Sequence, residues 1–145
     1  MGLDMYLYAE KYISDYKEEG KELSNKLFKA TGRRITSIRT EVGYWRKANA
    51  IHKWFVDNCQ DSRDECQSTF VPDEKLEELL ETVKQVLADP KLATELLPTT
   101  DGFFFGGTEY DSWYIQDLEE TKNILEKVLN DRSLDNWDFY YQSSW

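Results

Sequence analysis

The chain has 145 residues, the size of one domain with a hydrophobic core of its own. Charged residues make up 32% of it and the net charge is −10, so its surface as a whole repels long nucleic-acid polymers. No apolar run approaches the roughly 18 residues of a membrane span, and no signal-peptide pattern opens the chain. We therefore expect a cytoplasmic protein whose partners include neither a membrane nor a long nucleic acid.

The first half of the chain alternates between strand and helix patterns. Apolar residues occupy every second position from Leu3 to Leu7, which is the period of a half-buried strand. Leu23 and Leu27 then recur at helical spacing before Gly32, a residue typical of helix ends. The predicted elements are a strand over residues 1–12, a helix over 15–31, a strand over 34–42, a helix from Gly43 to residue 58, and a polar loop over 59–72.

Two amphipathic helices dominate the second half. Leucine, isoleucine and valine recur at helical spacing after Asp73 and again after Asp111, and aspartate is a favoured residue at helix N-termini. Between these helices, three consecutive phenylalanines predict a short buried strand. The predicted elements are a helix over 73–88, a short helical turn over 91–97, a strand over 103–105, a helix capped by residue 111 or 112, and a closing strand over 138–143.

This order of elements is typical of an α+β or α/β protein. We predict a single domain, residues 1–145, built as a two-layer sandwich of about four strands with helices packed on the sheet.

Positive charge is concentrated in one segment. Residues 26–53 contain eight basic side chains and one acidic side chain, a charge of +7, which leaves −17 for the rest of the chain. Such a segment can attract a small anion although the whole chain is acidic. It can equally face acidic helices of its own domain, and the sequence leaves both interpretations open.

The first candidate site lies in the same segment. On a helix that starts near Gly43, the side chains of Trp45, Asn49 and His52 form a stripe beside the core face, while Arg46 and Lys53 point away from the core. A ligand beside this helix could stack on the tryptophan and hydrogen-bond to the other two side chains. The alternative is a structural role in which all three are packed and satisfied inside the domain.

The second candidate site begins at Gly106 and Gly107, which follow the predicted strand and precede the last helix. Consecutive glycines allow a ligand to approach backbone amides at a helix N-terminus. This is no P-loop, because the Lys-Ser/Thr ending is absent and two carboxylates, Glu109 and Asp111, would repel phosphate. These acids could instead accept hydrogen bonds from a base edge or from ribose hydroxyls. The alternative is a tight turn with Asp111 as the helix cap.

Few residues suggest catalysis. We expect Cys59 and Cys66 to be reduced thiols. Two cysteines and one histidine are too few ligands for a metal site. We therefore expect neither a metal nor a cofactor. No nucleophile motif is present. His52 paired with a carboxylate is the one route to general-base chemistry, and we expect a binding protein rather than an enzyme.

The chain resembles a family of small bacteriophage and prophage proteins. The resemblance rests on residues 1–7 (MGLDMYL), 41–56 (EVGYWRKANAIHKWFV), 97–111 (LPTTDGFFFGGTEYD) and 139–145 (FYYQSSW), about a third of the chain. It implies an accessory protein acting in the bacterial host cytoplasm. By analogy, small phage proteins of this kind counter host defence, for example by sequestering nucleotide immune signals.

We therefore expect a homo-oligomeric protein that sequesters a small nucleotide-derived anion. Two alternatives stay open: an acidic inhibitor of a host nucleic-acid-binding or defence protein, and a nucleotide hydrolase that uses His52. The expected ligand-binding residues are Trp45 or Tyr110 for stacking, Arg39, Arg46, Lys47 and Lys53 for phosphate, Asn49 and His52 for orientation, and Glu109 and Asp111 for the base or ribose.

Overall fold

The computed structural model describes residues 2–145, so the first residue of the predicted opening strand lies outside the described range. None of the helices in this range is both long and apolar enough to cross a membrane. The elements in chain order are β1 (Asp4–Tyr12), α1 (Glu18–Thr31), β2 (Ser37–Arg46), α2 (Asn49–Cys59), β3 (Thr69–Val71), α3 (Asp73–Ala88), η1 (Pro90–Leu92), α4 (Ala93–Leu96), α5 (Ser112–Asn130), η2 (Arg132–Leu134) and β4 (Asp138–Ser144).

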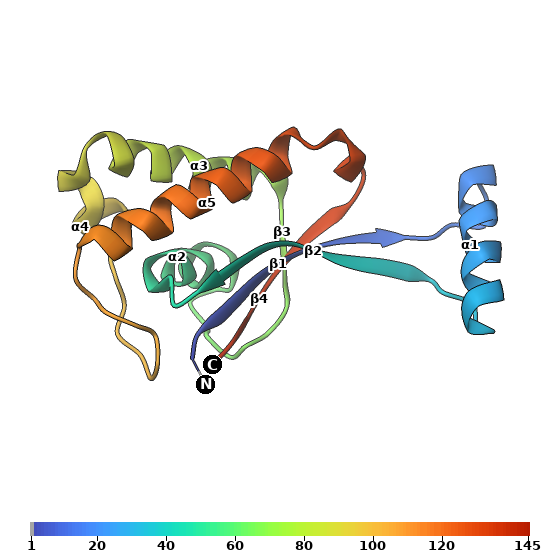
Figure 1. Cartoon of the computed structure of the whole chain (residues 1–145), viewed down its shortest axis with the longest axis horizontal. Helices are drawn as coiled ribbons and strands as arrows, with labels where there is room; N and C mark the ends of the chain where they lie inside the picture. The colour runs from blue at the N-terminus through green and yellow to red at the C-terminus, as the bar shows by residue number, and fades with distance from the viewer. Residues whose placement is uncertain (1) are drawn as a thin grey trace.

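The four strands form one antiparallel sheet in the order β2-β1-β4-β3. Helices α3 and α5 lie side by side and, with α2, cover one face of this sheet (Figure 1). The predicted α+β fold is therefore confirmed. An α/β fold is ruled out for this sheet, because each of its three strand pairs is antiparallel.

The core lies between the sheet and these helices. Along β1, Met5, Leu7 and Ala9 are buried while the alternating tyrosines point to the other face, the pattern expected of a sheet with one covered side. Helices α3 and α5 contribute Leu79 and Leu118 to the same core. The sequence predicted both the strand and the amphipathic helices correctly here, because the periods of two and 3.6 residues are local properties.

Strand β2 continues three residues beyond the expected helix start at Gly43, so this prediction is wrong. Gly43 is buried against α5: a Cβ at this position would lie 2.8 Å from Ile124 Cγ2. The glycine marks a close approach of helix and sheet rather than a break. Strand alternation then turns Trp45 into the core and leaves Tyr44 exposed, the reverse of the helical expectation.

The fourth strand is also not where the sequence placed it. Residues 103–105 form a turn, in which Phe103 and Phe104 are exposed and Phe105 alone is buried. Strand β3 lies instead in the predicted polar loop and pairs with the edge of β4. Three residues are too few for a periodic pattern, so only the tertiary pairing defines this strand.

Beyond the body, β1 and β2 continue as a hairpin that carries α1 at its far end (Figure 1). We call residues 11–38 the arm. At its base, the amide of Ile13 donates to the carbonyl of Thr36 across 2.9 Å, and the Ile13 side chain is buried. None of the fourteen described residues of α1 is buried, so this helix contributes nothing to the core of the body.

Candidate functional site

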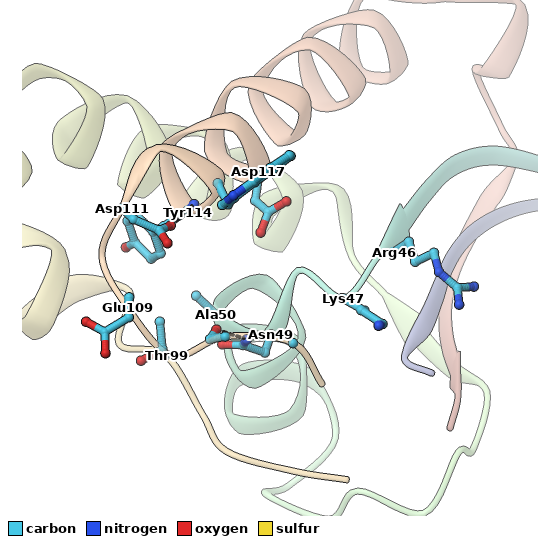
Figure 2. A pocket seen from close by; sticks show the side chains of 12 residues that line it. Arg46, Lys47, Asn49, Ala50, Thr99, Glu109, Asp111, Tyr114 and Asp117 are labelled. Atoms are coloured by element: carbon cyan, nitrogen blue, oxygen red, sulfur yellow. Dashed lines mark hydrogen bonds between the residues drawn. The ribbon is translucent and has the colours of Figure 1, made fainter. Parts of the chain in front are cut away.

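A cavity of about 360 Å³ opens between the β2–α2 turn, the loop before α5 and the first turns of α5 (Figure 2). We call it the site pocket. Its volume falls within the roughly 300–1,000 Å³ of small-molecule sites. It is lined by Arg46, Lys47, Asn49, Ala50, Thr99, Gly106, Gly107, Glu109, Asp111, Trp113, Tyr114 and Asp117. The two candidate sites of the sequence therefore meet in one pocket.

The turn that forms one wall is held from two sides. Lys47 has a φ of 58°, an unfavourable value for a residue with a side chain. Its amide donates to the carbonyl of Leu3 across 2.8 Å. On the other side, Gly106 has a φ of +89°, and a Cβ there would lie 3.2 Å from the Lys47 Cβ. Surrounding contacts thus stabilise a strained backbone beside the pocket.

Helix α2 begins directly after this turn, and no side chain caps its N-terminus, although the Asn49 amide donates to the carbonyl of Lys47 across 2.9 Å. Ala48, at the N-cap position, makes no side-chain cap hydrogen bond, and the first turn of α2 contains no acidic residue. Ala50 in this first turn lines the site pocket. Free amides and the positive end of the helix dipole favour an anion at such a place.

The two cationic side chains lie at this end of the pocket but point away from α5 (Figure 2). The Arg46 guanidinium donates from Nη1 to Asp4 Oδ1 across 3.0 Å, so its charge is partly neutralised inside the protein. Within residues 2–145, Lys47 forms no ion pair. Lys47 is therefore the cation that is available to a ligand at the pocket rim.

Asn49 holds the loop that closes the pocket. Its buried Nδ2 donates to the carbonyls of Phe105 and Gly107 across 3.1 and 2.8 Å, and its Oδ1 accepts from the Thr100 amide at 3.1 Å. All of its polar atoms are thus engaged. We expected this side chain to orient a ligand; it instead orients the wall of the pocket.

The opposite wall is acidic. Asp111 caps α5, as predicted, by accepting from the Tyr114 amide at 3.1 Å. Six residues further along, Asp117 points into the pocket (Figure 2). Burial, followed by the nearby charges of Glu120 and Asp111, raises the pKa of Asp117 to about 7. Near neutral pH this carboxyl can therefore either accept or donate a hydrogen bond.

Replacing Asp117 with asparagine is expected to stabilise the protein, and more so at higher pH. Because the Asp117 pKa rises from 3.8 to about 7 on folding, the folded state binds this proton more tightly than the unfolded chain. The natural protein therefore loses stability as pH rises from about 4 to about 7, and the asparagine variant does not. Allowing for solvent screening, we expect an advantage of roughly 1–2 kcal/mol above neutral pH.

Urea unfolding of both proteins across this pH range measures the difference. Glu119→Gln, an exposed carboxyl on the same helix, is the control and should show little effect. A stability difference between Asp117→Asn and the natural chain that does not change with pH would contradict the pKa assignment.

An exposed aromatic borders the acidic wall. Trp113 is 72% exposed and lines the pocket, so its ring is available for stacking. We did not expect it as a site residue, because its helical spacing suggested the core. Tyr110 does not line the pocket: its hydroxyl accepts from the Thr99 amide at 3.2 Å, and its ring packs on Tyr114. Tyr110 thus supports the pocket wall.

Trp45 is not available for stacking. Its side chain is buried, and Nε1 donates to Thr121 Oγ1 on α5 across 2.9 Å. The expected role was wrong because it assumed a helix, whereas the strand turns this ring into the core. Trp45 instead joins β2 to α5.

Lys53 and Arg39 lie outside the site pocket. Lys53 Nζ pairs with Asp57 Oδ2 at 2.7 Å, one helical turn further along α2. Arg39 pairs with Glu10 at 3.0 Å on the face of the sheet that the helices leave open. The expected cluster of four phosphate-binding cations is therefore reduced to Arg46 and Lys47.

His52 is buried at 1% exposure and does not reach the pocket. Its Nε2 lies 2.8 Å from Asp64 Oδ2 and its Nδ1 lies 2.6 Å from the buried Tyr141 hydroxyl. With a carboxylate as acceptor, Nε2 carries the proton and Nδ1 accepts from the tyrosine. Asp64 also accepts from Trp145 Nε1 at 2.9 Å. These bonds fasten the C-terminal strand to α2, so the expected roles in ligand orientation and general-base chemistry are corrected.

Other reactive groups are equally scarce. Burial raises the pKa of the Cys59 thiol to about 11, so it is protonated at neutral pH and a poor nucleophile. Across the described part of the chain, no three His, Cys, Asp or Glu side chains are grouped so that they could hold a metal ion.

No known protein family, curated protein or solved structure matches this chain. The function is therefore argued from the pocket itself.

Proposed function

We propose that the protein binds a small nucleotide-derived anion in the site pocket and holds it without chemical change. The observation that carries this proposal is that one wall of the site pocket favours a negative charge, while the other offers a stacking ring and hydrogen-bond acceptors. At one wall, the uncapped N-terminus of α2 and the side chain of Lys47 favour a phosphate. At the other, Trp113 offers a stacking surface, and Glu109 and Asp111 offer acceptors for amino or hydroxyl groups.

The pocket also limits the ligand. A volume of about 360 Å³ suits a compact ligand with one base better than a large cyclic oligonucleotide. The carboxylates of Glu109 and Asp111, joined by Asp117 when it is ionised, repel a ligand that carries several negative charges. A nucleotide with one phosphate group, or a cyclic form of it, fits both conditions.

Binding without turnover is supported by the absence of histidine and cysteine from the described residues of the pocket lining, which leaves Asp117 as the lining group suited to general acid–base chemistry. His52 is buried away from the pocket, and the Cys59 thiol is protonated at neutral pH. Neither can attack a ligand or activate water there. Retention of an intact nucleotide agrees with the sequestration of an immune signal, a role that we carry over from other small phage proteins by analogy.

Lys47→Glu is expected to weaken nucleotide binding by about 100-fold, because it places a negative charge beside the bound phosphate. Titration calorimetry against nucleoside monophosphates, cyclic mononucleotides and ADP-ribose measures the affinity. The matched control is Lys53→Glu, which makes the same charge change on the neighbouring helix outside the pocket and should retain the affinity of the natural chain. Absence of heat with every ligand would refute the proposal.

A further inference from the structure

Helix α1 is only partly packed within its own chain: Gly20 lies close to Ser14, and Leu23 and Leu27 are half-buried. It has fourteen residues, none of which is buried, and it lies at the far end of the arm (Figure 1). Isolated helices of roughly 12–15 residues are only marginally stable in water, and most helices in proteins depend on tertiary packing. The arm therefore presents a surface that another surface can cover.

The second half of the arm is basic, whereas α1 as a whole has three acidic and three basic side chains. Residues 23–38 contain four basic side chains and no acidic one. Two of these cations are paired within the arm, Lys26 with Glu22 at 3.6 Å and Arg34 with Asp15 at 2.8 Å. The other two, Lys29 and Arg33, form no ion pair with any residue of the described range.

The open face of the sheet is aromatic. Tyr6 stacks on Tyr8 with ring centroids 5.6 Å apart, and Tyr44 packs against Tyr6 at 5.4 Å. On the far strands, Phe70 packs against Tyr140 at 5.9 Å. Because α2, α3 and α5 cover the opposite side, these rings form an uncovered surface that we call the outer face. Its strands β1 and β2 continue directly into the arm (Figure 1).

The outer face carries two unpaired acids, opposite in charge to Lys29 and Arg33 of the arm. Glu41 lies opposite Tyr8, and Asp138 lies opposite Glu10, so both belong to this face. Neither forms an ion pair within residues 2–145. Lys29 and Arg33 of the arm thus have negative counterparts on the outer face. Asp138 also lines a cavity with residues of its own arm, among them Lys17 and Gly20, so Glu41 is the counterpart that lies farther from that arm.

The exposed aromatic area approaches what a stable dimer needs. At about 200 Å² per side chain, the five rings of the arm and outer face expose roughly 600 Å², and a typical stable interface buries roughly 800 Å² on each partner. These rings are Tyr12 (66% exposed), Tyr16 (95%), Phe28 (55%), Tyr44 (42%) and Phe70 (51%).

We propose that two copies of this chain form a dimer by exchanging arms, so that the basic arm of each copy lies against the aromatic and acidic outer face of the other. The two arm contacts are identical by symmetry, as a closed two-fold dimer requires. The site pocket lies among α2 and the start of α5, at the end of the molecule away from α1 (Figure 1). Arg46 is the lining residue that borders both surfaces, because it pairs with Asp4 on the outer face. The dimer itself does not depend on nucleotide binding.

Sedimentation equilibrium tests the dimer and its contacts. The natural chain should have twice the 17.2 kDa mass of one copy and should dissociate as salt rises from about 50 mM to about 500 mM. An arm variant, Lys29→Glu with Arg33→Glu, should be monomeric because its arm repels the outer face. A face variant, Glu41→Lys with Asp138→Lys, should be monomeric for the same reason.

Mixing the two variants gives the decisive result. In a mixed pair, the negative arm of the arm variant meets the positive face of the face variant. The natural arm of the face variant meets the natural face of the arm variant. Dimers that contain one copy of each variant should therefore form. Far-ultraviolet circular dichroism checks that both variants are folded. A monomeric natural chain, including one that binds anionic vesicles or nucleic acid instead, would overturn the proposal. So would dimers that persist in both variants, or a mixture that stays monomeric.

Discussion

Asn49→Asp is expected to lower the free energy of unfolding by about 3 kcal/mol or more. The natural amide donates to the carbonyls of Phe105 and Gly107. A carboxylate in its place has no proton to donate, and it would face both carbonyl oxygens while buried. The loop that closes the site pocket should then detach from α2, and nucleotide affinity should fall with it.

Asn58→Asp is the matched control, because it makes the same substitution at an exposed position of the same helix. Asn58 donates to the carbonyl of Trp54 at 2.9 Å near the C-terminus of α2, where an added negative charge costs about 1 kcal/mol or less. Urea unfolding gives both free energies, and hydrogen exchange reports on the loop amides. Equal destabilisation by the two variants would show that Asn49 does not hold the loop.

His52→Leu is expected to destabilise the protein by about 2–4 kcal/mol without altering nucleotide affinity below the melting temperature. The change leaves the buried Tyr141 hydroxyl and one oxygen of Asp64 without a partner. Affinity should persist because His52 does not line the pocket. A hydrolase that used this histidine would instead lose activity while keeping its stability.

A double-mutant cycle with Tyr141→Phe separates the shared hydrogen bond from other effects. The double variant should be destabilised by less than the sum of the two single changes, because both remove the same bond. Tyr140→Phe is the control, since this neighbouring ring points to the outer face and its hydroxyl forms no hydrogen bond with the described residues. Strictly additive free energies would contradict the proposed network.

Local patterns predicted most of the fold. The alternation in β1 and the spacing of leucines in α3 depend on which face of a single element is buried, and that face is visible in a short stretch of sequence. Predictions failed where contacts between distant segments of the chain decide whether a residue is buried. The predicted helix start at Gly43 is wrong, because this glycine accommodates Ile124 from α5 within a strand. Phe103 and Phe104 were assigned to the core, although they are exposed.

The candidate site was predicted in part. Five expected residues line the pocket: Arg46, Lys47, Asn49, Glu109 and Asp111. The sequence does not predict Trp113 and Asp117 as site residues, because their spacing on the helix does not show whether their side chains face a pocket or solvent. Trp45 and His52 were expected in the site and are buried instead.

Sequence patterns were enough to predict a domain of mixed helices and strands, its two long amphipathic helices and the clustering of positive charge before residue 54, whereas the antiparallel pairing of the strands decided for α+β over α/β. The predicted features follow from composition and short-range periodicity, which do not depend on the path of the rest of the chain. The tertiary structure alone decided that Lys47 and Asp117 share one pocket, that His52 is sealed in the core, and that α1 projects on an arm. Each of these depends on which surfaces pack against each other, and residues far apart in the sequence supply those surfaces.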